Sequence, residues 1–355
     1  MFFGPAEGVM EYPALVRMGT LYPFLDVLRR AGCPIDRHLE KCRLLRQVHE
    51  GDPEAYIPLA SALCFLERSS RAEGMEDLGF LAGSQTRIHD LGEYGRLILR
   101  EPTLLQAVRR SQEAASNYNT SLRFWVVSEG SHIRLCREFR LTSPVGLRHA
   151  DHFAQMMTWN TLRYWAGSQW RPHEIVFQSR APTTFELESR VGLRVRCAQA
   201  SSSLLVPRSI LAKPIRADGQ KIVTKASHLH FDSAPEDPID ALRNVIHAQL
   251  FEGYSDIRLA AEAAGMSVRT LQRRLVEVGL TYSRLLDDVR FTLAVSLMKN
   301  PEMKLIEIAL DLGYDSPGSF TRAFRRWSGF SPKEFRVANS PVRVDDAVAQ
   351  IAMSA

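Results

Sequence analysis

Apolar residues recur at two different spacings in the first 206 positions. Four stretches have apolar residues three or four positions apart, which is typical of helices: residues 20–32, 57–71, 103–117 and 150–165. Residues 122–139 alternate with a period of two around a polar turn at 128–131, which predicts a β-hairpin. Short apolar runs at 175–177 and 193–197 predict further strands. The pattern therefore predicts an α+β domain over residues 1–206, large enough to enclose a ligand pocket.

A change of composition separates this domain from the rest of the chain. Residues 207–235 include a stretch rich in Ser, Asp and Pro without a period, and we expect a linker there. From residue 236 to 336 the apolar spacing is helical, which predicts an all-α domain. Residues 337–355 have only a weak pattern, and we expect a flexible tail.

The all-α domain contains an internal repeat. Three segments match later ones at offsets of 48, 49 and 50 residues: 257–265 with 305–313, 271–278 with 320–327, and 279–285 with 329–335. Each copy has an apolar helix, a glycine that can take a positive φ, and a serine that can cap a second helix. Two such copies predict two helix-turn-helix units, joined by a helix over residues 283–299.

The second helix of each unit has an apolar face and a polar face. We expect the inward side chains to be Val268, Leu271, Leu275 and Val278 in the first copy, and Phe320, Phe324 and Trp327 in the second. The outward faces then carry Arg, Gln and Ser, and Arg can reach guanine while Gln can reach adenine in the major groove. The joining helix is about 25 Å long and would hold the two reading helices on successive turns of DNA, about 34 Å apart.

We expect the side chains that contact DNA to come from these two second helices and their caps. The candidates are Ser267, Arg269, Thr270, Gln272, Arg273, Arg274, Ser316, Gly318, Ser319, Thr321, Arg322, Arg325 and Arg326.

Net charge supports a nucleic-acid partner only weakly. The chain has 45 Lys and Arg against 40 Asp and Glu, a net charge of +5. Residues 236–336, however, contain 14 basic and 14 acidic residues, so the excess lies outside the predicted DNA-binding domain. The prediction therefore rests on where the arginines lie, because local clusters make the phosphate contacts.

Several classes of protein are disfavoured. The 5 cysteines, at 33, 42, 64, 136 and 197, have no C-x-x-C spacing, so we expect reduced thiols rather than a disulfide framework or a zinc site. No signal peptide and no run of 18 apolar residues is present, which predicts a cytoplasmic protein without a membrane partner. The common nucleophile, phosphate-loop, dinucleotide and zinc-protease motifs are missing, so we expect no enzyme activity, cofactor or metal.

A few polar and aromatic residues have competing interpretations. We interpret His149, Asp151 and His152 as an exposed helix start rather than a metal site, and we apply the same interpretation to His228 and His230 in the linker. Arg109 and Arg110 are expected to face water. The tryptophans of the first domain fit a pocket wall and a core equally well: Trp125, Trp159, Trp165 and Trp170.

Two segments of the all-α domain resemble a known family. The sequence GMSVRTLQRRLVEVGLTYSRLLDDVRFTLAVSLM and the later EIALDLGYDSPGSFTRAFRRWSGFSPKEFR resemble the C-terminal domain of AraC/XylS-type transcription regulators. The second segment carries that family's signature, from A-x-x-x-G-[FY]-x-S to G-x-[ST]-P-x-x-[FY]-R, and the resemblance covers about 100 residues. The first 205 or so residues are similar in layout to the sensor domain of a subgroup that includes regulators like the ornithine-utilisation regulator.

The resemblance implies a sequence-specific transcription regulator. It implies a first domain that binds a small-molecule effector and forms a homodimer, and promoter DNA and RNA polymerase as partners. By resemblance, Arg269, Gln272 and Arg273 read one half of a site, and Ser319 and Arg322 read the other. Gly318 stands where many members carry a polar residue, so we expect fewer base contacts from that helix. The resemblance favours an activator.

Two alternatives remain at this point. One is an architectural DNA-binding protein that needs no ligand, and the other is an enzyme tethered to nucleic acid. The sequence leaves open which effector binds, and it leaves open the operator, the sign of regulation and the oligomeric state, since no heptad seam of several repeats is present.

Overall fold

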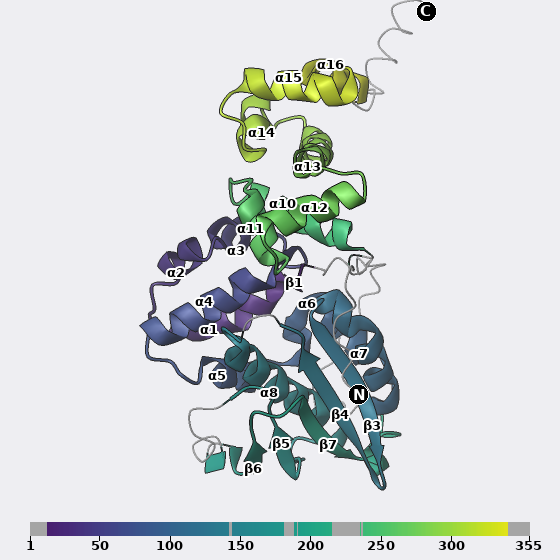
Figure 1. The fold of residues 1–355 in the computed structure, drawn as a ribbon. Helices are drawn as coiled ribbons and strands as arrows, with labels where there is room; N and C mark the ends of the chain where they lie inside the picture. Colours follow the sequence, from purple (N-terminus) through teal and green to yellow (C-terminus); the bar gives the residue numbers. More distant parts are fainter. Residues whose placement is uncertain are drawn as a thin grey trace, which may run out of the picture. The chain divides into compact units, whose positions relative to one another are not determined.

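The structure of the chain is a computed structural model that describes residues 13–141, 144–180, 188–189, 191–214, 235 and 237–339 (Figure 1). These residues form two compact units. The first comprises the chain up to Ala248 together with Leu259–Met266, and the second comprises Gln249–Arg258 and the chain from Ser267 onward. In the described part, no helix is long and apolar enough to cross a membrane.

The first unit is an α+β structure, as predicted. Its helices, apart from α10, are α1 (Tyr22–Arg30), α2 (Ile35–Lys41), α3 (Leu45–Glu50), α4 (Leu59–Ala72), α5 (Leu78–Gln85), α6 (Gly92–Leu99), α7 (Leu104–Tyr118) and α8 (Leu147–Ala166), with 3-10 turns η1 (Met18–Leu21), η2 (Ile88–Leu91) and η3 (Arg208–Ile210). The four predicted helices correspond to α1, α4, α7 and α8. Helices α2, α3, α5 and α6 were not predicted, because six to eight residues are too few to show a clear period.

An antiparallel pair of strands and a larger mixed sheet complete the first unit. Strands β1 (Leu15–Arg17) and β2 (Tyr56–Pro58) form an antiparallel pair. The larger sheet has the order β3-β4-β7-β5-β6, with β3 (Leu122–Glu129), β4 (His132–Phe139), β5 (Glu174–Val176), β6 (Arg194–Arg196) and β7 (Ser202–Pro207). The predicted hairpin and both short strands are present. Strand β7 was not predicted, and it lies between β4 and β5, where its neighbours on both sides bury it.

The first unit continues past the position where we placed the linker. Strand β7 ends at Pro207, η3 follows, the amide of Leu105 donates to the carbonyl of Leu211, and Thr103 forms a β-bridge with Pro214. The rest of the predicted linker, apart from residue 235, lies outside the described residues, and so do His228 and His230. The units divide inside α10 (Pro238–Phe251) rather than at residue 236. One reason is that the side-chain amide of Gln47 donates a buried hydrogen bond to the carbonyl of Ala248.

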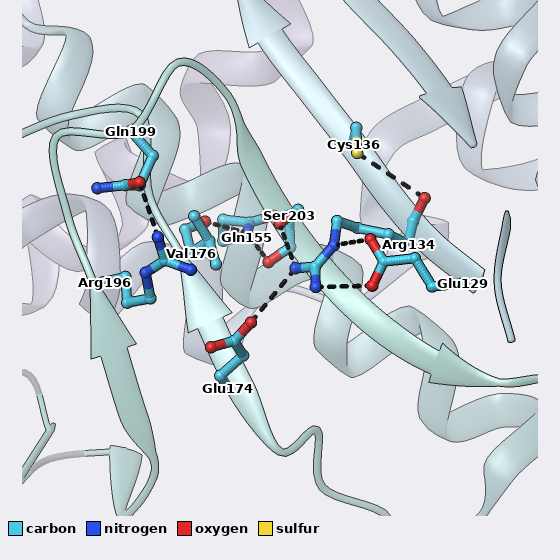
Figure 2. Close-up of polar contacts among 9 residues, drawn as sticks. All are labelled: Glu129, Arg134, Cys136, Gln155, Glu174, Val176, Arg196, Gln199 and Ser203. Atoms are coloured by element: carbon cyan, nitrogen blue, oxygen red, sulfur yellow. Dashed lines mark hydrogen bonds and ion pairs between the residues drawn. The ribbon is translucent and has the colours of Figure 1, made fainter. Parts of the chain in front are cut away.

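A network of polar contacts around Arg134 joins four strands of the larger sheet. Arg134 of β4 pairs with both carboxylate oxygens of Glu129 at 2.5 and 2.9 Å, and it donates to Glu174 of β5 and to Ser203 of β7 at 3.3 and 3.2 Å (Figure 2). The hydrogen bonds to Arg134 lower the pKa of Glu129. From the other face, Gln155 of α8 donates to the carbonyls of Val176 and Ser203. These contacts fix the order of the strands and the position of α8.

Helix α8 buries the polar residues that we had placed on the surface. His149, Asp151 and His152 are 0, 0 and 2% exposed, so the prediction of an exposed helix start is wrong. The reason is a close approach of α5, because a Cβ at Gly79 or Gly83 would clash with the backbone of His149 or Phe153 on α8. Asp151 accepts from the amide of Ser179 and the hydroxyl of Ser202. Within the described residues, no group of three metal-ligating side chains is present.

Other predictions for the first unit agree with the structure. Arg109 and Arg110 are exposed, and Arg110 pairs with Glu101 and Glu113. Trp159 and Trp165 both belong to the core, and Trp165, which is completely buried, also lines a cavity. The cysteines are free thiols, and the sulfurs of Cys42 and Cys64 lie 3.3 Å apart.

The second unit is helical, as predicted. The C-terminal helices are α11 (Ile257–Ala263), through which the division between the units passes, α12 (Val268–Glu277), α13 (Tyr282–Met298), α14 (Leu305–Asp311), α15 (Pro317–Ser328) and α16 (Pro332–Asn339). Helix α16 extends three residues beyond the predicted start of the tail, and residues 340–355 lie outside the described residues.

The buried histidines make the stability of the first unit sensitive to acid. Burial lowers the pKa of His149 to about 4 and that of His152 to about 3, from an ordinary value of 6.5. Between pH 6.5 and about 4, the unfolded chain binds protons that the folded chain does not bind, so the free energy of unfolding falls as the pH falls. We expect His149 alone to account for about 2 kcal/mol of this loss at pH 5.

The test is urea unfolding at pH 7.5 and pH 5, followed by tryptophan fluorescence. We expect His149→Leu to lose less stability between the two pH values than the wild type. His173→Leu, which removes an exposed histidine, serves as the control. Equal pH dependence in the wild type and in His149→Leu would contradict the assignment.

Candidate nucleic-acid interface

The second helix-turn-helix unit is built around one apolar cluster. Ile308 and Ala309 of α14, Leu312 directly after it, and Phe320 and Phe324 of α15 are 0% exposed. They pack with Ala294 and Met298 of α13, and Phe291, Trp327 and Phe335 surround them. Two large aromatic rings on one face of α15 therefore anchor the helix and fix which residues face away.

The turn between α14 and α15 is held in place by specific backbone contacts. Gly313 has φ +70°, and the amide of Tyr314 donates to the carbonyl of Ala309 at 2.9 Å. The guanidinium of Arg290 in α13 donates to the carbonyl of Leu312 and stacks over the ring of Tyr314 at 4.6 Å. The helix end is thus satisfied by both the backbone and a side chain of the joining helix.

Helix α15 begins as the sequence predicts. The hydroxyl oxygen of Ser316 accepts from the amide of Ser319 at 3.3 Å, and Pro317 occupies the first helical position, where its missing N–H costs nothing. The helix ends at Ser328, and Gly329 follows with φ +79°.

The first copy has the same local geometry. Gly265 has φ +65°, and the hydroxyl of Ser267 accepts from the amide of Thr270 at 3.2 Å to cap α12. Leu271 and Leu275 are completely buried. The expectation that Val278 faces inward is wrong, because Val278 is 56% exposed. Helix α12 ends at Glu277, so Val278 no longer follows the helical period.

The predicted contact residues fall into two groups by exposure. The exposed ones are Ser267, Arg269, Gln272, Arg273, Gly318, Arg322, Arg325 and Arg326. The partly buried ones are Thr270, Arg274, Ser316, Ser319 and Thr321. Within the described residues, the Nη1 atom of Arg274 is buried without a hydrogen-bond partner. Arg274 therefore turns partly away from the outward face of α12.

Ion pairs distinguish the arginines of α15 from one another. Arg326 pairs with Asp287 of α13 at 2.7 Å, and Arg325 approaches Glu334 of α16 at 3.8 Å. Arg322 donates to the hydroxyl of Ser319 at 3.1 Å, and within the described residues it has no carboxylate partner. On α12, Arg273 has only a loose, exposed pair with Glu277 at 3.6 Å. Arg269, Arg273, Arg322 and Arg325 are exposed and have no close carboxylate partner among the described residues, so they are the arginines most available to an outside ligand, since exposed pairs are weak.

Sequence reasoning assigned no residues to a ligand site in the first unit, and the structure contains a cavity there. Leu135, Arg137 and Phe139, at alternate positions of β4, all line it. Arg137 is 5% exposed. An arginine in the inward register of a strand is a signal that the sequence contained, because inward positions are normally apolar.

Two family models match the chain. The family described as "Helix-turn-helix domain" matches residues 260–338. The family described as "Arabinose-binding domain of AraC transcription regulator, N-term" matches residues 32–215, which is more than half of the 355 residues.

Individual relatives match different shares of the chain. The ornithine utilization regulator of Pseudomonas aeruginosa is 41% identical over 85 residues, which are 24% of this chain and 25% of that protein. The HTH-type transcriptional regulator VirS of Mycobacterium tuberculosis is 24% identical over 334 residues, which are 92% of this chain and 98% of VirS. The crystal structure of transcriptional regulator CdpR from Pseudomonas aeruginosa matches with 18% identity and a TM-score of 0.42, over 90% of this chain and 98% of that chain.

Removal of the α15 cap has a predictable cost. We expect Ser316→Ala to destabilise the start of α15 by about 1 kcal/mol, because the amide of Ser319 loses its side-chain acceptor. Amide hydrogen exchange of residues 317–322 measures this as faster exchange. Ser296→Ala on the exposed side of α13 is the control, and equal exchange in both variants would show that the cap contributes nothing.

Proposed function

The chain belongs to the AraC family of transcription regulators, and from this premise we propose that it binds promoter DNA sequence-specifically in response to a small-molecule effector. The observation that carries the proposal is the outward arginine on each capped second helix, Arg273 on α12 and Arg322 on α15. Arginine side chains in this position suit guanine in the major groove.

We assign different tasks to the predicted contact residues. Arg269, Gln272 and Arg273 read one half of the site, and Ser319 and Arg322 read the other. Arg326 pairs with Asp287 at 2.7 Å, and Arg325 lies 3.8 Å from Glu334 in an exposed, weak contact; we assign both to the phosphate backbone. Ser267, Thr270, Ser316 and Thr321 lie at or near the helix N-termini, where hydroxyl groups and amides suit phosphates.

We assign effector binding and homodimerisation to the domain before the linker. A ligand that binds two arrangements of the protein with different affinity would change the contact with DNA or with RNA polymerase. We propose an activator in the cytoplasm. In this assignment residues 236–336 form the DNA-binding domain, and the chain before residue 236 connects it to the sensor domain.

The reading helices are tested by fluorescence anisotropy with a promoter fragment selected by footprinting. We expect Arg273→Ala and Arg322→Ala each to weaken specific binding by about 1–3 kcal/mol, because each loses a contact to a base edge. Arg109→Ala on α7, an exposed arginine of the sensor domain, is expected to bind as the wild type does. If Arg273→Ala and Arg322→Ala both bind the fragment as tightly as the wild type does, the assignment of the reading helices is wrong.

The alternative function is that of an architectural DNA-binding protein without an effector. A thermal-shift screen against metabolites separates the two functions. We expect at least one compound to raise the melting temperature, since a ligand that binds only the folded state stabilises it. An absence of any stabilising compound, together with intact DNA binding, would favour the architectural role.

A further inference from the structure

We propose that the cavity of the first unit binds a small monocarboxylic acid with an apolar body, and that Arg137 holds the carboxylate. This inference rests on the proposed function for its regulatory meaning, since it gives the chemical class of the effector. The binding itself depends only on the residues of the first unit.

The cavity is an apolar space inside the sensor domain. Its wall includes Leu21, Phe24, Leu63, Leu66, Phe153 and Leu162, which come from helices distant in sequence and are all less than 7% exposed. The volume open to the centre of a water molecule is about 120 Å³. At roughly 10–15 Å³ for each water, this space suits a ligand of roughly ten non-hydrogen atoms.

The wall offers few free hydrogen-bonding groups to a sugar. The hydroxyls of Ser111, Thr158 and Thr161 donate to the carbonyls of Ala107, Ala154 and Met157 in their own helices, at 2.9, 2.7 and 2.8 Å. A pentose needs a partner for most of its hydroxyls, and burial without partners costs free energy. The description of the matched family names arabinose, but this wall suits a largely apolar molecule.

Arg137 is the exception in this wall. Its guanidinium donates to the hydroxyl of Thr158, while its Nη1 atom is buried without a hydrogen-bond partner in the described part of the chain. Among the described residues no carboxylate lies within ion-pair distance of Arg137. Asp151 attracts it from farther away, but the carboxylate oxygens of Asp151 accept from Ser179 and Ser202.

Two further hydroxyls at the wall lack a full hydrogen bond. Burial raises the pKa of the Tyr118 phenol, and the neighbouring Thr20 hydroxyl lowers it. Within the described residues, the hydroxyls of Tyr118 and Thr20 form no hydrogen bond of normal geometry. Burial also raises the pKa of Tyr94, while the Ser111 hydroxyl and the Arg137 guanidinium lower it, and the ring of Tyr94 stacks on that of Tyr118 with the centroids 4.8 Å apart. The cavity wall thus contains two unused hydroxyls as well as one positive charge.

This arrangement selects one ligand chemistry. A buried cation without an anion is costly, and a carboxylate that accepts from Nη1 would compensate its charge through a strong charge-assisted hydrogen bond. One guanidinium balances one negative charge, and apart from the hydroxyls of Tyr118 and Thr20 the wall suits mainly apolar groups. An amine of the same shape would be repelled, and an alcohol would leave the charge uncompensated.

The first experiment is isothermal titration calorimetry of the full chain, without DNA, with octanoate, 4-phenylbutanoate, octan-1-ol, octylamine and L-arabinose. We expect at least one of the two carboxylates to bind at least tenfold tighter than octan-1-ol, and we expect no binding of octylamine or L-arabinose. Two results would overturn the proposal. One is that octanoate and octan-1-ol bind with equal affinity and 4-phenylbutanoate does not bind. The other is that L-arabinose alone binds.

Variants then assign the carboxylate to its partner. We expect Arg137→Gln to lose at least tenfold in carboxylate affinity and to bind octan-1-ol unchanged. Arg123→Gln, an exposed arginine on the neighbouring strand β3, is expected to bind both compounds as the wild type does. Retention of the carboxylate preference in Arg137→Gln would refute the role of Arg137.

A measurement on the wild type covers the case in which Arg137→Gln does not fold. Carbon NMR of carboxyl-labelled ligand in the complex reports its titration, and we expect the bound carboxylate to stay ionised to a lower pH than the free acid. A bound carboxyl group whose pKa is higher than that of the free acid would show that the ligand binds in its neutral form, away from Arg137. Because these tests use no DNA, their failure rejects the ligand class and leaves the DNA-binding proposal to its own anisotropy test.

Discussion

The structure depends on the amphipathic division of two capped helices. In each unit the second helix buries one face completely while its other face stays exposed to solvent. In α15 the buried face is Phe320 and Phe324, which are 0% exposed, and in α12 it is Leu271 and Leu275. Because the rotation of a helix about its own axis is fixed by what it buries, these side chains determine that Arg322 and Arg273 face outward.

The arginines of α15 differ in their partners. Arg326 pairs with Asp287 of α13 at 2.7 Å, and Arg325 lies 3.8 Å from Glu334 of α16. Arg322, on the adjacent part of the surface, donates to a serine hydroxyl, and no carboxylate of the described residues pairs with it. A local excess of guanidinium groups over carboxylates is therefore present on this helix, although the whole 236–336 segment has no net charge.

Two arginines of one strand illustrate the same principle in the sensor domain. Arg134 and Arg137 are three positions apart on β4, so they point to opposite faces of the sheet. Arg134 is fully paired with Glu129, Glu174 and Ser203 (Figure 2). Arg137 faces the cavity and keeps an unused donor. The face of the strand, and not the residue type, decides which arginine is structural and which is available to a ligand.

The sequence by itself determined the features that depend on neighbours along the chain. Periodicity located α1, α4, α7 and α8, the β3–β4 hairpin and the C-terminal helices, because helical and strand periods are local. The repeat located both turns and both caps, since Gly313 and Ser316 act on atoms within five residues of themselves. Tertiary structure alone decided what depends on distant partners. It placed β7 inside the sheet, it buried His149 and Asp151 through the close approach of Gly79 on α5, and it brought no carboxylate of the described residues within ion-pair distance of Arg137. Burial of a polar group depends on which segments pack around it, and no local pattern specifies those segments.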